Sequence, residues 1–301
     1  MIAAEKAATA ELCVERACDL LEVSRSGFYA WRGRATRGPS NAELARQARD
    51  DLVAACHEAS HRVYGVPRVT AQLRCDGHQV SRKAVQASMR RQGLQGISPR
   101  PWKPVTTLAE SGRQSWPPDL VDRSWDTGEL NKVWTSDITY LPTGEGWLFL
   151  AAVRDGCSRR VIGYAFADTL HTDLVVAAVS RAVMFRGVDS PNVILHADRG
   201  CQYTSTQMAL CAEALDLRIS VGRTGVCWDN AQQESFWSTL KTEFYNRHAF
   251  ATRADAITAV SRWIDQTYNH RRLHSALGMQ TPAAYEQQLT TPTATPIPEA
   301  A

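Results

Sequence analysis

"NVILHADRGCQYTS", residues 192–205, places an acidic residue directly after a predicted buried strand. The run Val193–Leu195 is short, apolar and partly β-branched, as is typical of a strand in the core of a sheet. Asp198 follows it and comes before Gly200 and several small hydroxyl residues. Loops at the carboxyl ends of strands often carry the catalytic groups of α/β proteins. Asp198 is therefore a candidate catalytic residue, although an aspartate at such a place is more often a turn former.

Strands and helices alternate on both sides of this segment. A short Gly-Cys-Ser turn joins the second predicted strand to the third, like a hairpin. The predicted strands are 132–141, 147–155, 159–167, 192–198 and 218–222, and the predicted helices are 172–187, 204–217, 230–246 and 253–268. This order predicts an α/β fold with a mixed five-stranded sheet, whose first three strands form a meander, and with flanking helices.

The region before this sheet is predicted to be all-α. Helical patterns cover 8–34, 41–58, 68–75 and 81–92, with a turn at Asp76-Gly77 and a possible cap at Ser81. A helix, a short turn and a capped basic helix form the outline of a helix-turn-helix. We therefore divide the chain into a helical, DNA-binding region (1–97), a linker (98–128), an α/β core (129–288) and a disordered tail (289–301).

The basic residues are concentrated in one part of the chain. The net charge is only +3, but residues 62–104 hold nine Lys and Arg against the single acid Asp76. Such a block favours a polyanionic partner. A solvated surface is the simpler explanation, but the apolar residues within the block keep a helical spacing that a disordered tail would not keep.

Two further acids occupy unusual positions. Asp137 interrupts the first predicted strand, where aspartate is disfavoured. Glu234 lies in the first turns of a helix, where an acid also stabilises the helix dipole. If the first and fourth strands are neighbours, Asp137 and Asp198 converge, and crowded carboxylates repel unless a cation neutralises them. Mg²⁺ prefers oxygen ligands, and two ions about 4 Å apart can clamp a phosphoryl displacement.

Several classes of protein are disfavoured. No run of apolar residues is long enough for a membrane span, and the N-terminus has no apolar signal region. The eight cysteines form no C-x-x-C pair, which argues for reduced thiols and against a zinc finger. We expect a cytoplasmic protein.

The local motifs resemble one family. "VWTSDITYL", "HADRGCQYTS", "CWDNAQQESFWSTLKTE" and "YNHRRLHSALGMQTPAAYE" are similar to segments of OrfB transposases of the IS-three group of bacterial insertion sequences. The resemblance covers roughly residues 12–287 and includes the upstream helices. Asp137, Asp198 and Glu234 have the spacing of the retroviral integrase superfamily, which implies a ribonuclease-H-like catalytic core. Cys201 and the pair Gln232-Gln233 depart from the residues common in the group.

The resemblance implies a DDE-type transposase that cuts and joins DNA at the ends of an insertion sequence. Asp137 and Asp198 would hold one Mg²⁺, and Asp137 and Glu234 a second, with Mn²⁺ as a substitute. One ion would activate water or a DNA 3′-OH, and the other would stabilise the leaving 3′ oxygen. Lys241 matches a basic position near the DNA. The implied partners are double-stranded DNA, further copies of the chain, and the product of an upstream frame, OrfA, or a fusion with it, at the bacterial nucleoid.

Other basic residues are weaker candidates for DNA contact. Arg271 and Arg272 could hold phosphates or simply be surface charges. Arg82 and Lys83 open a predicted helix, where positive charge opposes the helix dipole, so a DNA phosphate would explain their placement better than helix stability does.

Two other functions remain open from the sequence. One is a ribonuclease-H-type nuclease that cuts without joining, and the other is a DNA-binding regulator with an inactive core. Asp155, which ends the second strand before a glycine, is left out of the acidic triad, and His196 is expected to be structural.

Overall fold

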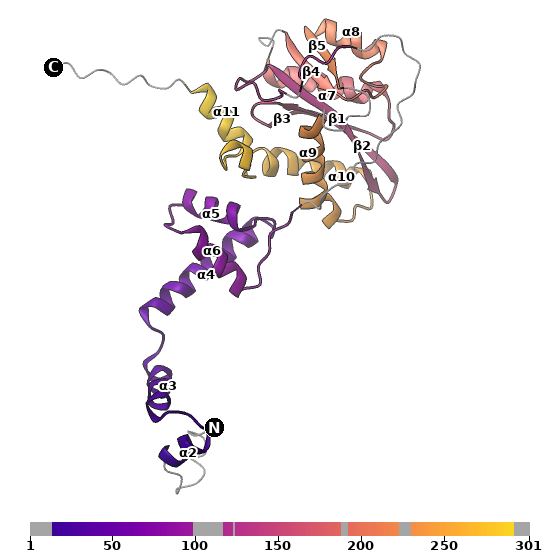
Figure 1. Cartoon of the computed structure of the whole chain (residues 1–301). Coiled ribbons are helices and arrows are strands. Elements are labelled where there is room, and N and C mark those ends of the chain that lie inside the picture. The colour runs from indigo at the N-terminus through magenta and orange to yellow at the C-terminus, as the bar shows by residue number, and fades with distance from the viewer. Residues whose placement is uncertain (1–13, 99–116, 123, 188–191, 223–229, 292–301) are drawn as a thin grey trace, which may run out of the picture. The chain divides into compact units, whose positions relative to one another are not determined.

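The chain folds into two compact units (Figure 1). The computed structural model describes residues 14–98, 117–122, 124–187, 192–222 and 230–291. The N-terminal unit extends to Gln95, and the C-terminal unit begins at Gly96. Within the described residues, no helix has both the length and the apolar character needed to cross a membrane.

The described part of the N-terminal unit consists of helices. They are α2 (Val14–Leu20), α3 (Arg25–Arg37), α4 (Asn41–Ala59), α5 (Val66–Cys75) and α6 (Arg82–Arg91). Ser24, Ser40 and Ser81 cap α3, α4 and α6, because each side-chain oxygen accepts a bond from the N–H group three residues later. The last three helices confirm the predicted ones to within two residues at each end.

Helices α4, α5 and α6 share a small core. Its apolar side chains are almost fully buried, and they are Val53, Val69, Leu73, Val85 and Met89. Asp50 of α4 adds a polar contact, because its carboxylate accepts bonds from Ser88 Oγ at 2.6 Å and Arg91 Nη2 at 2.5 Å. The core holds α6 by its buried face and leaves the first two residues of the helix, Arg82 and Lys83, exposed.

A mixed five-stranded sheet forms the centre of the C-terminal unit, as predicted. The strands are β1 (Val133–Thr143), β2 (Gly146–Asp155), β3 (Val161–Ala167), β4 (Val193–Ala197) and β5 (Leu217–Val221). Their spatial order is β3-β2-β1-β4-β5. The first three strands form an antiparallel meander, and β4 and β5 continue the sheet in parallel with β1.

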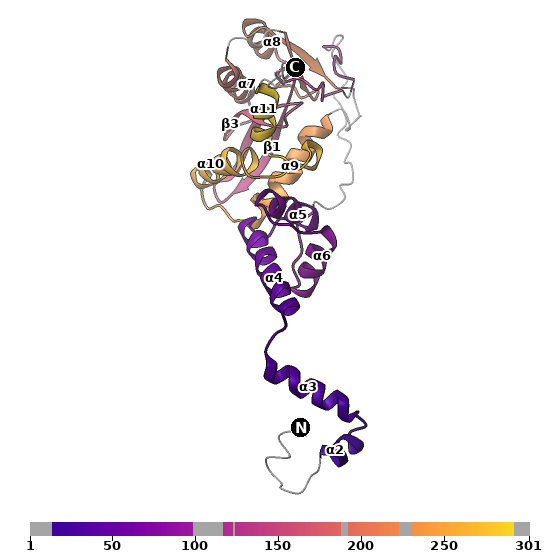
Figure 2. The same cartoon turned by 90° about the vertical axis from the view of Figure 1, so that its left-hand side faces the viewer.

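Helices cover both faces of this sheet (Figures 1 and 2). On one face, α7 (Thr172–Arg186) and α8 (Thr206–Ala214) bury one apolar cluster. On the other, α9 (Ala231–Glu243), α10 (Arg253–Arg262) and the π-helix η3 (Trp263–Tyr268) bury a second cluster rich in aromatic rings. Helix α7 approaches β3 so closely that a Cβ at Gly163 would lie 2.4 Å from the carbonyl oxygen of Ala178. Glycine is therefore required at that position.

The end of the predicted linker packs on the core. Residues 99–116 and 123 lie outside the described residues. The Leu120 N–H donates to Ser220 Oγ of β5 at 2.9 Å, and Val121 is buried. The chain therefore joins the C-terminal unit several residues before the predicted boundary at 129.

A C-terminal segment, residues 269–290, closes the fold. It includes the short helix η4 (Ser275–Leu277) and ends in α11 (Pro282–Thr290), and the short helix η2 (Tyr245–Arg247) lies further upstream. The Asn269 side chain pairs with both backbone groups of Val161 on the edge strand β3. Helix α11 includes the first two residues of the predicted tail, and residues 292–301 lie outside the described residues.

Glu286 anchors α11 through a buried ionic network. Its carboxylate accepts bonds from Ser158 Oγ and Arg160 Nη1, both at 2.6 Å, and from Arg186. Burial alone would raise the pKa of Glu286, but these donors outweigh it and hold the pKa below its ordinary value. The lowered pKa means that Glu286 stabilises the fold above its unfolded pKa of about 4.3, and that this contribution is lost as the pH falls through the folded value.

Glu286→Gln is expected to lower the free energy of unfolding of the C-terminal unit by about 3 kcal/mol at pH 7, because it removes the hydrogen-bonded counter-charge of the largely buried Arg186 and leaves only Asp155, at 3.6 Å. Urea denaturation followed by tryptophan fluorescence would measure this loss. The deficit should shrink in acid, where Glu286 of the wild type is protonated as well. Gln287→Ala, at an exposed position of the same helix, is the control and should change stability little. Equal stability of Glu286→Gln and the wild type would contradict the anchoring role.

Candidate active site

The pairing of β1 with β4 brings Asp137 and Asp198 together. The two strands are parallel, with Thr135 opposite His196. Asp137 and Asp198 each follow two residues later, so the register carries both acids to the same place at the end of the β1–β4 pairing. The convergence predicted from the sequence depended on these strands being neighbours, and they are.

The Asp137 carboxylate accepts two hydrogen bonds and lies close to two other acidic side chains. Its Oδ1 accepts a bond from the Ile138 N–H at 2.7 Å, and its Oδ2 accepts one from Trp237 Nε1 at 2.9 Å. Burial, followed by the charges of Asp198 and Glu234, raises the pKa of Asp137 to about 7, although those two bonds act in the opposite direction. Asp137 therefore lies in an environment that needs a cation if all the acids are to be ionised.

Asp198 lies in the loop that follows β4. Its Oδ1 accepts a bond from the Gly200 N–H at 2.9 Å. The residue is exposed, but the protein around its carboxyl group removes enough water to raise its pKa. A Cβ at Gly200 would come within 2.9 Å of the same carboxyl oxygen. The glycine that follows Asp198 thus allows the backbone to bind this acid.

Glu234 reaches the site from the first turn of α9. It is half-buried, and burial raises its pKa. It is near enough to Asp137 for its charge to raise the pKa of that residue. Across the described part of the chain, no three Asp, Glu, His or Cys side chains are grouped closely enough to enclose an ion. The structure therefore brings the two aspartates together and places Glu234 close by. The three carboxylates are not yet close enough to surround a metal ion.

Buried amides that the sequence analysis missed hold α9 in place. Gln233 is fully buried, and its Nε2 donates to the carbonyl oxygens of Thr135 at 2.7 Å and Ala152 at 3.0 Å. Asn230 Nδ2 donates to Ser136 O at 3.2 Å, and Gln232 Nε2 to Gly156 O at 3.1 Å. The signal was present in the sequence, since Gln232-Gln233 depart from the family pattern directly before the acid.

Tyr203 is buried close to the two aspartates. Its ring is buried, and its hydroxyl lies 2.8 Å from Ser136 Oγ, next to Asp137 in the chain. Burial raises the pKa of Tyr203 well above its ordinary value, and the charges of Asp137 and Asp198 add to the effect. Tyr203 was not among the predicted site residues.

The predicted DNA contacts of the C-terminal unit have different surroundings. Lys241 is half-buried on α9, where burial lowers its pKa while the charge of Asp137 raises it, which places the ammonium group near the site. Arg271 is exposed. Arg272 is buried, and its guanidinium donates twice to the Glu243 carboxylate, at 2.7 Å each. A bidentate bond to Glu243 uses the planar edge that a phosphate would need.

Asp155 and His196 have structural contacts. Asp155 is buried and accepts bonds from the N–H groups of Asn131, Cys157 and Ser158, as expected of a turn former. His196 Nδ1 lies 2.9 Å from Ser220 Oγ in the buried part of the sheet.

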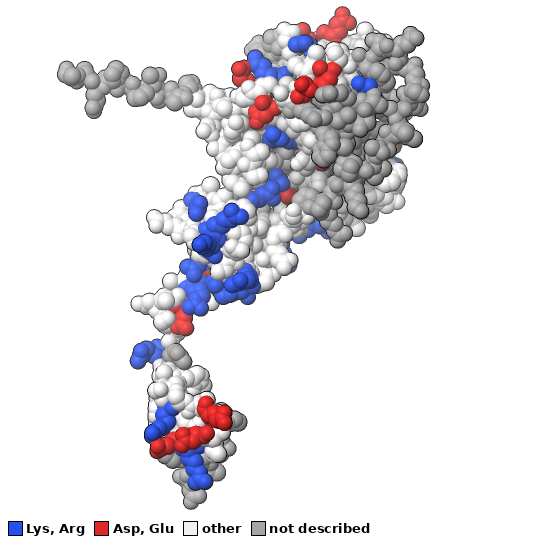
Figure 3. All heavy atoms as spheres, viewed as in Figure 1, with Lys and Arg blue, Asp and Glu red and all other residues white. Residues whose placement is uncertain are grey.

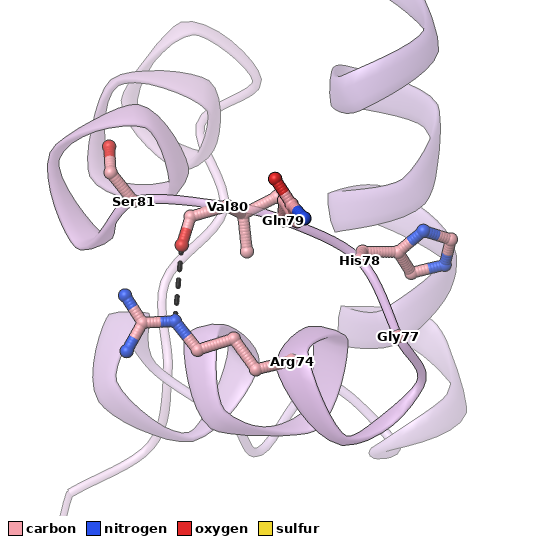
Figure 4. A pocket seen from close by; sticks show the side chains of 6 residues that line it. All are labelled: Arg74, Gly77, His78, Gln79, Val80 and Ser81. Carbon is pink, nitrogen blue, oxygen red and sulfur yellow. Dashed lines mark hydrogen bonds between the residues drawn. The ribbon is translucent and has the colours of Figure 1, made fainter.

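In the N-terminal unit, the turn between α5 and α6 leaves a surface depression. Arg74, Gly77, His78, Gln79, Val80 and Ser81 line it. Arg74 Nε donates to the Val80 carbonyl at 3.1 Å, which ties α5 to the turn (Figure 4). Arg82 and Lys83 follow directly at the exposed start of α6. Lys and Arg side chains gather over helices α4–α6 (Figure 3).

Comparisons with known proteins agree with both units. Residues 129–227 and 215–282 match two family models described as integrase core domain. Residues 43–102 match a model described as HTH-like domain. Among solved structures, the simian T-cell lymphotropic virus intasome with PP2A regulatory subunit B56 gamma aligns at 17% identity and a TM-score of 0.45, covering 83% of this chain and 78% of that one. The HTLV-2 integrase catalytic core domain in complex with magnesium (dimeric form) aligns at 15% identity and a TM-score of 0.40, covering 51% and 94%.

Curated relatives match over nearly the whole chain. The insertion element IS600 uncharacterized 31 kDa protein of Shigella sonnei is 30% identical over 271 residues, covering 90% of this chain and 97% of the relative. Transposase InsF for insertion sequence IS3A of Escherichia coli (strain K12) is 37% identical over 279 residues, covering 93% of this chain and 96% of the relative. With this likeness across both units and an integrase core domain around the paired aspartates, the chain belongs to the IS3 family of transposases.

Proposed function

We propose that this transposase cleaves and joins DNA strands at the ends of an insertion sequence, in a metal-dependent reaction that uses Asp137, Asp198 and Glu234. The observation that carries the proposal is the meeting of Asp137 and Asp198 on adjacent parallel strands, with raised pKa values and with the charge of Glu234 nearby.

A hard divalent cation fits this donor set. The three side chains offer carboxylate oxygens alone, which suits Mg²⁺, or Mn²⁺ in its place. Asp137 would contribute to two ions, one shared with Asp198 and one with Glu234. When bound, such ions supply an activated oxygen nucleophile and charge stabilisation for the leaving 3′ oxygen. Each ligand must give up its proton to bind, which the cation itself favours.

Other groups of the site orient the two aspartates or bring positive charge close to them. The N–H groups of Ile138 and Gly200 and the indole of Trp237 orient the two aspartates through hydrogen bonds. Lys241 brings a positive charge to the same region, where we propose that it binds a DNA phosphate. Arg271 stays a candidate for a second phosphate contact, and Arg272 would have to leave its bonds to Glu243 to make one.

DNA is held, in this proposal, by the N-terminal unit as well. Helix α6 presents Arg82 and Lys83 at its exposed start, and the surface over α4–α6 is rich in basic side chains (Figure 3). A phosphate at this helix end would interact with both side chains and with the helix dipole. As in the family, we propose that the active form is an oligomer on DNA and that it works with the OrfA product or fused to it.

Two rival functions make different predictions in one assay. A nuclease would release cut ends without joining them, and a regulator would bind DNA without cutting it. A DNA fragment that carries the ends of the element, incubated with a target plasmid and Mg²⁺, should give joined products. Cutting without joining would favour the nuclease, and neither product would favour the regulator.

The acidic triad can be tested by isosteric substitution. Asp137→Asn, Asp198→Asn and Glu234→Gln should each reduce cleavage and joining below detection and leave DNA binding nearly unchanged, since each removes a metal-binding charge and little volume. Gel assays of cleavage and of binding would measure the two separately. Glu213→Gln, on the exposed face of α8, is the matched control and should keep activity. Cleavage at the wild-type rate by any triad variant would remove that acid from the site.

The choice of metal gives an independent test. Mg²⁺ or Mn²⁺ should support cleavage, whereas Ca²⁺ should support DNA binding with little chemistry, because its longer and more flexible coordination misplaces the phosphate. The measurement is product formation with each ion after removal of metals by EDTA. Equal rates of cleavage in EDTA and in Mg²⁺ would contradict a metal-dependent reaction.

The salt dependence of DNA binding tests the role of α6. The double variant Arg82→Ala with Lys83→Ala should lower the magnitude of the slope of log K against log salt concentration by roughly two, because each lost phosphate contact contributes about one. Fluorescence anisotropy with labelled duplex DNA would give the slope. The control, Arg218→Ala with Arg262→Ala, removes two exposed charges from β5 and α10 and should leave the slope unchanged. Equal slopes for all three proteins would contradict the contact.

A further inference from the structure

Helix α9 faces the site with two functional side chains. Glu234 and Trp237 are three residues apart on this helix and therefore lie on the same side of it. Glu234 is one of the proposed acids. Trp237 is 7% exposed, and its ring packs against Phe236, with the ring centres 4.7 Å apart. Packing on this scale leaves the indole little freedom, so its N–H points in a fixed direction.

The indole N–H of Trp237 is hydrogen-bonded to Asp137. It donates to Asp137 Oδ2 at 2.9 Å, while Oδ1 takes the Ile138 N–H at 2.7 Å. The two oxygens thus have different donors, and this pair of bonds sets the rotation of the carboxylate about its own axis. Each carboxylate oxygen has a second lone pair that is still able to bind a cation.

The same helix is tied to β1 directly before Asp137. Gln233 donates to the carbonyl oxygen of Thr135 and Asn230 to that of Ser136. Together with the indole bond, three side chains from the N-cap and first half of α9 bind three successive residues of the strand. Any movement of the helix that carries Glu234 would therefore also disturb the donor that orients Asp137.

We propose that Trp237 is a positioning residue for metal binding, which holds the Asp137 carboxylate in the orientation that a divalent cation requires and couples that orientation to the placement of Glu234. The proposal rests on the proposed function, since it assumes that Asp137 is a metal ligand. Groups that hold a metal ligand by a hydrogen bond commonly change metal affinity by 10- to 100-fold when removed. A merely structural indole would change stability and leave affinity alone.

The test compares Mn²⁺ binding by full-length variants without DNA, measured by electron paramagnetic resonance of the free ion. Trp237→Phe keeps an aromatic ring and removes the N–H, and it should weaken Mn²⁺ binding about tenfold. Trp263→Phe is the matched control: its ring lies in the same aromatic cluster, and its substitution should leave Mn²⁺ affinity unchanged. The Mn²⁺ binding that is lost in Asp137→Asn is the binding at the proposed active site, as distinct from binding elsewhere on the protein.

The outcomes separate the two proposals. If Asp137→Asn loses Mn²⁺ binding while Trp237→Phe binds like the wild type, the role of Trp237 is overturned and the proposed function stands. If Asp137→Asn binds Mn²⁺ like the wild type, Asp137 is not a metal ligand and both proposals fail. Tenfold weaker binding by Trp237→Phe, with normal binding by Trp263→Phe, supports the positioning role.

A second measurement needs no change at position 237. In wild-type protein with ¹⁵N-labelled tryptophan, one indole N–H resonance should shift when Mg²⁺ is added, and the shift should be absent in Asp137→Asn. This readout remains informative if Trp237→Phe does not fold. The absence of any indole shift, under conditions where Mn²⁺ binds at Asp137, would overturn the proposal.

Discussion

The parallel pairing of β1 with β4 is the constraint on which the site depends. Thr135 lies opposite His196, and the acids follow at equal distances along the two strands. A slip of one residue would turn one of the acids to the opposite face of the sheet. The apolar side chains of both strands prevent such a slip, because Trp134, Val193 and Leu195 are buried in one cluster and would be exposed by it.

Two carboxylates placed close together repel each other when both are ionised, and the surrounding structure must offset this repulsion. Burial and mutual repulsion raise the pKa of Asp137, while two hydrogen bonds act in the opposite direction. Helix α9 contributes to both effects, since it carries Glu234 and Trp237. The buried amides of Asn230, Gln232 and Gln233 hold that helix against the sheet through bonds to backbone carbonyls. The carbonyls in turn give acceptors to amide N–H groups that would otherwise be buried without a partner.

The C-terminal segment supports the same helix from its other end. Arg272 and Glu243 form a buried bidentate pair between this segment and the last turn of α9. Glu286 joins α11 to the turn between β2 and β3, and Gln232 binds Gly156 in that turn. The "YNHRRLHSALGMQTPAAYE" motif, which gave part of the family resemblance, is thus used largely for structure.

The sequence by itself determined the strands, the helices up to residue 268 and their order, because the periodicity of apolar residues depends on local chemistry. It also singled out Asp137 and Asp198 by their positions in and after strands, but it did not predict α11. It also determined the capped basic helix before the sheet, where Ser81 marks the start. Only the tertiary structure decided which polar residues face one another. Arg272, Tyr203, Trp237 and Gln233 have their partners about 30 to 100 positions away in the chain, and no local pattern encodes such a pairing. Burial then decides between surface charge and ion pair, since a buried guanidinium must find a counter-charge within the fold.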